Sequence, residues 1–336
     1  MCEGSLRHKP NVCENAAGDL TSRQSMIAGK TTVDIMRATT SLAALLLGLA
    51  LSLNACGGDE KPVNESEAEM TAETADVNAA ATFKIDPAVH VDSVAGFRKL
   101  LDSAGVTGNI LIYDSRDGKF YSNDFNRCAQ SWLPASTFKI VNTMIGLETG
   151  ELRNKHDLFK WDSIPRRMDA WNRDLRLIEA YQVSCVPCYQ QLARRIGPER
   201  MNAWLDSIDY PGMDVNNETI DTFWLEGKSR ISSLQQLDFI HRLLKHELPL
   251  SEHTYKELRD IMLLGESKGL RLSGKTGWSI RDDFNIGWFV GMVEGPERYA
   301  CVVVNIEPTE RIEPDNFPMV RQKLAMQALR QMGFDF

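Results

Sequence analysis

Pro134-Ala135-Ser136-Thr137-Phe138-Lys139-Ile140 places a lysine three residues after a serine, at the start of a pattern that stays helical through Leu147 and stops at Gly150. A proline near the first turn and a glycine just past the last turn are typical of helix ends. The spacing puts Ser136 and Lys139 on one helix face, where the lysine can act as base for a nucleophilic serine. The helix N-terminus adds backbone N–H groups that favour an oxyanion.

A second motif, Lys275-Thr276-Gly277 followed by Trp278, falls on the first of the late strands. A lysine and a hydroxyl on a strand edge can hold a carboxylate, and glycine lets a ligand approach the backbone closely. Each motif alone also occurs by chance. Their order, helix start first and late strand second, makes the pair specific.

The remaining pattern predicts strands, then helices, then strands and one last helix. The predicted strands are 108–113 and 119–122, joined in a hairpin by the turn 115–118, and later 270–273, 285–293 and 299–306. The predicted helices are 177–196, 198–208, 232–246, 251–264 and 319–332. This order indicates an α+β fold, with a helical insertion beside an antiparallel sheet.

The composition is that of a globular protein. The chain has 336 residues, of which 43% are hydrophobic and 25% charged, so it has enough apolar material for one large core or two small ones. Disordered, collagen-like and multi-span membrane proteins are excluded. The net charge of −8 gives no reason to expect nucleic acid as a partner.

The first 55 residues are predicted to be a leader. Met36 and Arg37 precede an apolar run over 42–53, which is typical of a signal peptide and too short to span a bilayer. Leu53-Asn54-Ala55-Cys56 resembles the bacterial lipobox, so Cys56 is the expected lipidation site. The alternative is an ordinary signal peptidase site beside a chance cysteine. The true start is Met26 or Met36 in this interpretation.

Residues 56–82 are predicted to be a flexible tether. Seven acidic residues and one lysine give the segment 57–82 a net charge of −6, with few large apolar side chains. The catalytic domain is expected over 83–336. The whole would be an exported lipoprotein, anchored to a membrane and facing the periplasm or the cell surface.

Several further blocks carry a family resemblance. Ser184-Cys185-Val186 stands between the two motifs, and Gly146-Leu147-Glu148-Thr149-Gly150, Gln182-Val183-Ser184 and Phe223-Trp224-Leu225-Glu226-Gly227 accompany it. S-x-x-K with K-T-G is a signature of β-lactamases and penicillin-binding proteins. With S-x-V as the middle element, the chain from about 108 to 334 resembles the class D, oxacillinase-type serine β-lactamases of the penicillin-recognising superfamily.

The resemblance implies a fold and a function. The fold is the serine β-lactamase/DD-peptidase fold, an antiparallel sheet flanked by helices with a mostly helical subdomain. The function is hydrolysis of β-lactam antibiotics, penicillins and oxacillin-like drugs, which confers antibiotic resistance. A DD-peptidase that releases β-lactams slowly, or a β-lactam sensor that does not release them, are the alternatives. Such sensors need membrane spans and a signalling module, and the only apolar segment here is the leader.

The residues that take part in catalysis by the same resemblance are Ser136, Lys139, Ser184 and Trp224. Ser136 is the nucleophile, and its backbone N–H forms the oxyanion hole with that of Trp278. Lys139 is carboxylated to N6-carboxylysine by carbon dioxide or bicarbonate, and no other cofactor and no metal is expected. Ser184 relays protons.

The other implied roles concern the carbamate and the substrate. Trp224 would hold the carbamate, with Val186 and Leu225 as apolar lining. The residues expected to bind the substrate carboxylate are Lys275, Thr276, Gly277 and Arg321. The role of Arg321 is inferred only from its position at the start of the last helix.

One family element is missing. Where the family has Tyr-Gly-Asn, this chain reads Tyr210-Pro211-Gly212-Met213, so the element is altered or a residue is inserted. Substrate range and loop shape depend on this difference.

The remaining cysteines and histidines are predicted to be structural. Cys185 and Cys188 form a C-x-x-C, interpreted as packing cysteines in a helix rather than as a redox or zinc site, since no thioredoxin-like pattern or second metal-binding pair accompanies them. His241 and His246 are not spaced as H-E-x-x-H, so they are predicted to lie on a solvated helix face.

Overall fold

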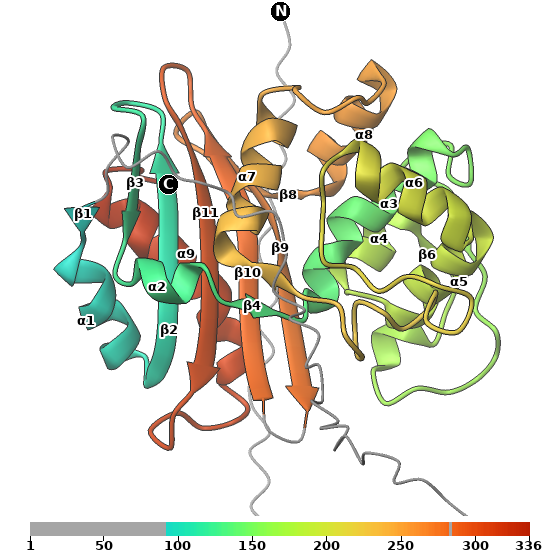
Figure 1. Ribbon diagram of the computed structural model, residues 1–336, viewed down its shortest axis with the longest axis horizontal. Helices are drawn as coiled ribbons and strands as arrows, with labels where there is room; N and C mark the ends of the chain where they lie inside the picture. Colours follow the sequence, from blue (N-terminus) through green and yellow to red (C-terminus); the bar gives the residue numbers. More distant parts are fainter. Residues whose placement is uncertain (1–91, 282–283) are drawn as a thin grey trace, which may run out of the picture. The chain divides into compact units, whose positions relative to one another are not determined.

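A seven-stranded sheet lies between two groups of helices in the computed structural model, which describes residues 92–281 and 284–336 (Figure 1). The strand order is β1-β3-β2-β11-β10-β9-β8, antiparallel except for the β1–β3 pair. These strands are β1 (Asp92–Ser93), β2 (Val106–Asp114), β3 (Lys119–Ser122), β8 (Leu263–Ser267), β9 (Leu270–Arg281), β10 (Phe284–Glu294) and β11 (Tyr299–Pro308). Two small sheets pair β4 (Ser131–Trp132) with β7 (Ile231–Ser232), and β5 (Leu158–Phe159) with β6 (Leu175–Arg176).

The helices fall into the two groups that cover the sheet. The α-helices are α1 (Ala95–Ser103), α2 (Phe125–Cys128), α3 (Lys139–Glu148), α4 (Leu177–Gln182), α5 (Val186–Ile196), α6 (Pro198–Ser207), α7 (Ser233–Leu244), α8 (Glu252–Ile261) and α9 (Phe317–Gln331). The 3₁₀ helices are η1 (Ala135–Phe138) and η2 (Asp169–Trp171). One apolar cluster joins the sheet to α1 and α9, and a larger one joins its other face to α3 through α8.

Burial explains why the central strands are almost continuously apolar. β10 and β11 carry runs of buried residues without alternation, because helices cover both faces of the sheet. α3 is buried over its whole length up to Leu147, which accounts for its apolar sequence and makes Lys139 at its first position exceptional.

The structure confirms the predicted α+β class, and the β2–β3 hairpin forms as expected. The prediction of one helix over 177–196 is wrong, because α4 ends at Gln182 and α5 begins at Val186. Between them Ser184 has φ of +55°, and Pro187, which has no N–H for the helical ladder, lies in the first turn of α5. The predicted strand 270–273 extends to Arg281, and β8 occupies the place where the helix 251–264 was expected to end.

No helix within 92–281 and 284–336 is long and apolar enough to cross a membrane. The predicted leader, Cys56 and the tether lie outside the described residues, so the predicted domain boundaries remain predictions.

Candidate active site

Ser136 lies in the tight turn η1 that precedes α3, so a 3₁₀ turn rather than the predicted α-helix carries it. Ala135 enters the turn with φ of +50°, a strained value for a residue with a side chain. Thr137 Oγ1 donates to Pro134 O at 2.6 Å and accepts from Gln236 Nε2 at 2.8 Å. These bonds fix the backbone on both sides of Ser136.

Lys139 lies beneath the serine. Its side chain is fully buried, and its Nζ donates to Ser136 Oγ at 3.0 Å. Burial lowers the pKa of Lys139 well below the ordinary lysine value, and the charge of Lys275 lowers it further. The Nζ also lies 5.1 Å from the ring centroid of Tyr189 on α5. The neutral amine of Lys139 is therefore favoured over the charged ammonium, and a neutral amine can accept a proton.

The K-T-G motif lies on β9 beside the serine turn. β9 pairs with β8 only as far as Ser273, so the edge from Lys275 onward is not covered by β8. A Cβ on Gly277 would lie 3.0 Å from Thr137 Cγ2 and 3.1 Å from Pro134 O. The glycine is thus needed for the close approach of β9 to the serine turn, a different reason from the ligand approach that the sequence suggested.

Arg321 reaches the same strand from α9. Its Nη1 donates to Gly277 O, its Nε donates to Pro318 O at 2.8 Å, and its guanidinium lies 5.8 Å from the Trp278 ring centroid. Burial, and then the charge of Arg321, lower the pKa of Lys275 to about 7. Burial also lowers the pKa of Arg321 to about 10. Arg321 therefore keeps its positive charge at neutral pH, while Lys275 changes its charge close to neutral pH.

The S-x-V turn lies between two tyrosines that face the lysines. Tyr181 on α4 has its ring centroid 5.6 Å from Lys275 Nζ and donates its hydroxyl to Gly274 O at 3.2 Å. Tyr189 on α5 faces Lys139 as described above. Ser184 lies in the turn between these helices, three residues after Tyr181 and five before Tyr189.

Trp224 packs over the residue that precedes Lys139. Its ring stacks on Phe138, with centroids 5.9 Å apart and planes 18° apart, and it is fully buried. Among residues 92–281 and 284–336, nothing accepts a hydrogen bond from its Nε1–H. An orphaned buried donor is costly, so an acceptor at this place would be stabilising. Val186 and Leu225 are half-buried, and Leu225 packs against the larger cluster.

The altered Tyr-Gly-Asn element forms a close backbone contact. Gly212 has φ of +80°, and a Cβ there would lie 2.2 Å from Arg230 O, so only glycine fits. Arg230 N–H donates to Gly212 O at 2.7 Å. Tyr210 packs edge-on against Phe138, so this segment supports the helix that carries Lys139.

Two predictions for structural residues are wrong. Cys185 and Cys188 form a disulfide, because Cys185 is the N-cap of α5 and Cys188 lies in the first turn, with their Cα atoms 5.5 Å apart. His241 does not lie on a solvated face. It is half-buried, packs edge-on against Tyr113 and lies 3.2 Å from Tyr299 Oη. His246 is exposed, as predicted, although it lies just beyond the end of α7 and stacks on Tyr255.

The sequence pattern predicts no role in the site for Tyr181, Tyr189 or Gln236. The two tyrosines flank the S-x-V motif on separate helices, and Gln236 lies far along the chain on α7. Nothing in the local pattern distinguishes them from core residues. Only the proximity to S-x-V could have drawn attention to the tyrosines.

The assembled site can perform acyl transfer on an anionic substrate. It has a hydroxyl beside a neutral amine, and Lys275 and Arg321 supply positive charge for a carboxylate. Within the described part of the chain, no cluster of histidine, cysteine and carboxylate side chains could hold a metal ion.

Comparison with known families defines the class of protein. Residues 104–319 match the family described as the penicillin binding protein transpeptidase domain. That segment contains Ser136, Lys139, Ser184 and the K-T-G motif, and ends just before Arg321.

Individual relatives narrow the class. The chain is 36% identical to β-lactamase OXA-48 of Klebsiella pneumoniae over 67% of its own length and 83% of the relative's. It is 37% identical to OXA-10 of Pseudomonas aeruginosa, over 59% of this chain and 75% of the relative. A class D β-lactamase structure from Nostoc superposes with a TM-score of 0.67 at 37% identity, covering 70% of this chain and 98% of that one.

The chain belongs to the class D serine β-lactamases, which are serine hydrolases. The predicted serine β-lactamase/DD-peptidase fold is thereby confirmed. The C-terminal domain of the Bacillus licheniformis BlaR penicillin receptor is also similar, with a TM-score of 0.65 at 27% identity over 71% of this chain and 96% of that one. The fold alone therefore does not separate an enzyme from a receptor.

Proposed function

We propose that this protein hydrolyses β-lactam antibiotics, penicillins and oxacillin-like drugs in particular, through an acyl-enzyme on Ser136. The observation that carries the proposal is the fully buried Lys139 Nζ, 3.0 Å from Ser136 Oγ. Lys139, carboxylated as argued below, is the general base at this place, and the hydroxyl proton is taken up there as the oxygen attacks the lactam carbonyl. The C–N bond of the ring then breaks, and the ring nitrogen takes up a proton relayed through Ser184.

The oxyanion and the substrate carboxylate have separate places in this scheme. The backbone N–H groups of Ser136 and Trp278 stabilise the carbonyl oxygen as it gains negative charge. Lys275, Thr276 and Arg321 bind the carboxylate that penicillins carry, and the half-buried Val186 and Leu225 line the site.

Carboxylation of Lys139 fits the residues present. A neutral amine adds carbon dioxide to give a carbamate and one proton, and the orphaned Trp224 Nε1–H is a donor for its oxygen. When bound, the carbamate would supply the base for both acylation and deacylation. Phe138, Val186 and Leu225 are the apolar side chains that this proposal assigns to keep the amine neutral.

Multiple turnover tests the function directly. The full-length protein is mixed with a chromogenic cephalosporin, and the product is counted against enzyme. Hydrolysis far beyond one equivalent is expected for a β-lactamase. A single burst of one equivalent would instead support the sensor or DD-peptidase alternative.

The pH profile of kcat/KM is expected to be bell-shaped. Lys139 must be neutral, so activity is lost as pH falls through its lowered pKa. Lys275 must be charged, and its pKa of about 7 means that activity falls as pH rises above that value. The Arg321→Ala substitution should move the alkaline limb upward, because the arginine charge lowers the pKa of Lys275. An alkaline limb that stays in place in Arg321→Ala would contradict its assignment to Lys275.

Added bicarbonate should also move the alkaline limb of the parent protein upward, because the negative charge of a carbamate on Lys139 would raise the pKa of Lys275.

Loss of Arg321 should weaken substrate recognition. The Arg321→Ala substitution is expected to lower kcat/KM by about 10- to 100-fold, the effect of losing one hydrogen bond to a charged group. Steady-state kinetics measure this, with Arg330→Ala near the exposed end of α9 as control. Unchanged kinetics in Arg321→Ala would mean that another cationic side chain binds the substrate carboxylate.

Lipidation of Cys56 would anchor the protein to a membrane, on the periplasmic or cell-surface side. The Cys56→Ser substitution is expected to move the protein from the membrane fraction to the soluble fraction, as measured by fractionation and immunoblotting. Retention of Cys56→Ser in membranes after a salt wash would contradict the lipobox interpretation.

A further inference from the structure

The disulfide between Cys185 and Cys188 directly follows Ser184 in the chain. It joins the N-cap of α5 to the first turn of the same helix, where Cys188 N–H also lies 3.2 Å from Cys185 Sγ. A disulfide stabilises the fold mainly by closing a loop of the unfolded chain, and the effect is small for short loops. With three residues of separation, this bond acts locally rather than on the whole domain.

The local feature that it adjoins is the strained turn at Ser184. A φ of +55° is rare for a residue with a side chain and persists only where the surroundings hold it. On the α4 side, Ser184 N–H donates to Tyr181 O at 3.1 Å, and Cys185 N–H donates to Ala180 O at 2.8 Å. On the α5 side, the disulfide fixes the backbone directly after the serine.

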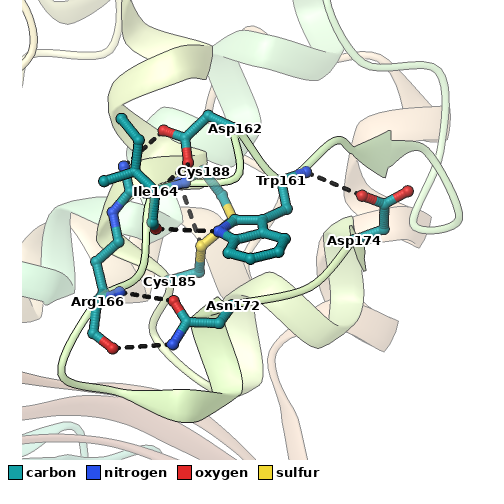
Figure 2. A network of polar contacts seen from close by, with 8 residues as sticks. All are labelled: Trp161, Asp162, Ile164, Arg166, Asn172, Asp174, Cys185 and Cys188. Carbon is teal, nitrogen blue, oxygen red and sulfur yellow. Dashed lines mark hydrogen bonds and ion pairs between the residues drawn. A yellow bond between two sulfur atoms is a disulfide. The ribbon is translucent and has the colours of Figure 1, made fainter.

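A folded loop also holds the residue before the serine. Trp171 Nε1 donates to Val183 O at 3.0 Å. The loop is stiffened within itself, since Trp161 N–H donates to Asp174 at 2.9 Å and Arg166 N–H donates to Asn172 at 2.7 Å. Figure 2 shows the Trp161–Asp174 loop together with the disulfide. A long-range contact thus fixes one neighbour of Ser184, and a covalent bond fixes the other.

We propose that the Cys185–Cys188 disulfide is a positioning element for Ser184, so that turnover depends on the redox state of this cysteine pair. The inference rests on the proposed function of Ser184 as proton relay. With the bond formed, the turn keeps the hydroxyl in place. With two thiols, the first turn of α5 relaxes and the hydroxyl leaves its place. The substrate carboxylate is bound from β9 and α9, whereas Ser184 moves the proton, so the effect falls more on kcat than on KM.

The redox step uses an external dithiol. A thiolate of dithiothreitol attacks one sulfur of the bond, Cys185 leaves as a thiolate and takes up a proton, and a mixed disulfide with Cys188 remains. The second thiol of the reagent then attacks the mixed disulfide and releases Cys188. The protein gains two protons and two electrons, and the reagent becomes a cyclic disulfide. Oxidised glutathione reverses the reaction. An exported location is one where protein disulfides persist.

The experiment compares three states of the full-length protein. The oxidised protein, the protein reduced with dithiothreitol and then desalted, and the reoxidised protein are assayed with a chromogenic cephalosporin. Thiol titration of denatured samples gives the state of the pair. Reduction is expected to lower kcat about tenfold, part of what a proton-transfer group contributes. KM should change less than kcat, and reoxidation should restore both.

Three variants make the test specific. The paired substitution Cys185→Ser/Cys188→Ser should reproduce the reduced state and ignore dithiothreitol. The pair Cys128→Ala/Cys301→Ala removes the free buried cysteines and should respond as the parent does. In Ser184→Ala, kcat should already be low, and reduction should lower it no further.

Defined outcomes overturn the proposal. If the oxidised protein hydrolyses the cephalosporin and reduction leaves kcat unchanged, the disulfide proposal is wrong. The proposed function would remain valid. No hydrolysis by the oxidised protein would overturn both. A loss of kcat that is equally large in Ser184→Ala, or that matches a loss of near-ultraviolet circular dichroism, would show a general structural effect instead.

Discussion

Replacement of Ser136 by alanine is expected to abolish covalent labelling by a fluorescent penicillin and to lower kcat by on the order of 10⁴-fold or more. The reason is geometric, since the Ser136 hydroxyl is the one to which buried Lys139 Nζ donates at 3.0 Å. The turn should remain folded, because Thr137 and Gln236 hold its backbone rather than the serine hydroxyl. Gel fluorescence measures labelling, and circular dichroism checks the fold.

The matched control is Ser207→Ala, the same change at the exposed end of α6. It should be labelled as the parent is. Labelling of Ser136→Ala at the parent rate would remove Ser136 from the nucleophile role, and mass spectrometry of the labelled peptide would then identify the residue that reacts.

The periodic parts of the fold could be predicted from sequence. The β2–β3 hairpin and the strands β10 and β11 carry their own signals, a turn between apolar runs and dense β-branched residues. The approach of Ser136 to the K-T-G strand could be expected only through the family resemblance. The glycine of that motif makes the approach possible by leaving room for Thr137.

The break at Ser184 could be predicted only in part, because Pro187 is visible in the sequence as a helix-start signal but the contact of Trp171 with Val183 is long-range. The apolar spacing over 177–196 continues as if one helix ran through it. The left-handed turn depends on Trp171 from a separate loop and on the disulfide of Cys185 and Cys188. A C-x-x-C in sequence is compatible with packing, metal binding or a disulfide, and only the folded structure distinguishes these three roles.

The local sequence pattern also does not predict the roles of Arg321 and Trp224. Arg321 contacts Gly277 across 44 positions in the chain, and helix periodicity does not indicate which strand it reaches. Trp224 looks like an ordinary core residue, since it is fully buried and stacked on Phe138. Its orphaned donor, which Trp132 shares, is a property of the folded state alone.

The site keeps several costly features close together. Ala135 and Ser184 have left-handed backbones, Lys139 is buried without an acidic partner among its pKa determinants, and Trp224 has an unpaired donor. Each costs stability on its own. Their location around one hydroxyl is expected where catalytic residues are held ready, and a carbamate on Lys139 would offset two of these costs by pairing with the indole donor and removing the bare amine.

Removal of the indole donor is therefore expected to trap the acyl-enzyme. The Trp224→Phe substitution keeps an aromatic ring against Phe138 but lacks the N–H, while Trp224→Ala removes both. Both should slow deacylation by about 10²- to 10³-fold, the cost of losing one hydrogen-bond donor to a catalytic anion, and should slow acylation less. Stopped-flow kinetics and intact-protein mass spectrometry measure the two steps. Steady-state hydrolysis by the parent should rise with added bicarbonate, and high bicarbonate should partly rescue Trp224→Phe. Normal deacylation in Trp224→Phe, with no response of the parent to bicarbonate, would mean that Lys139 works as a free amine.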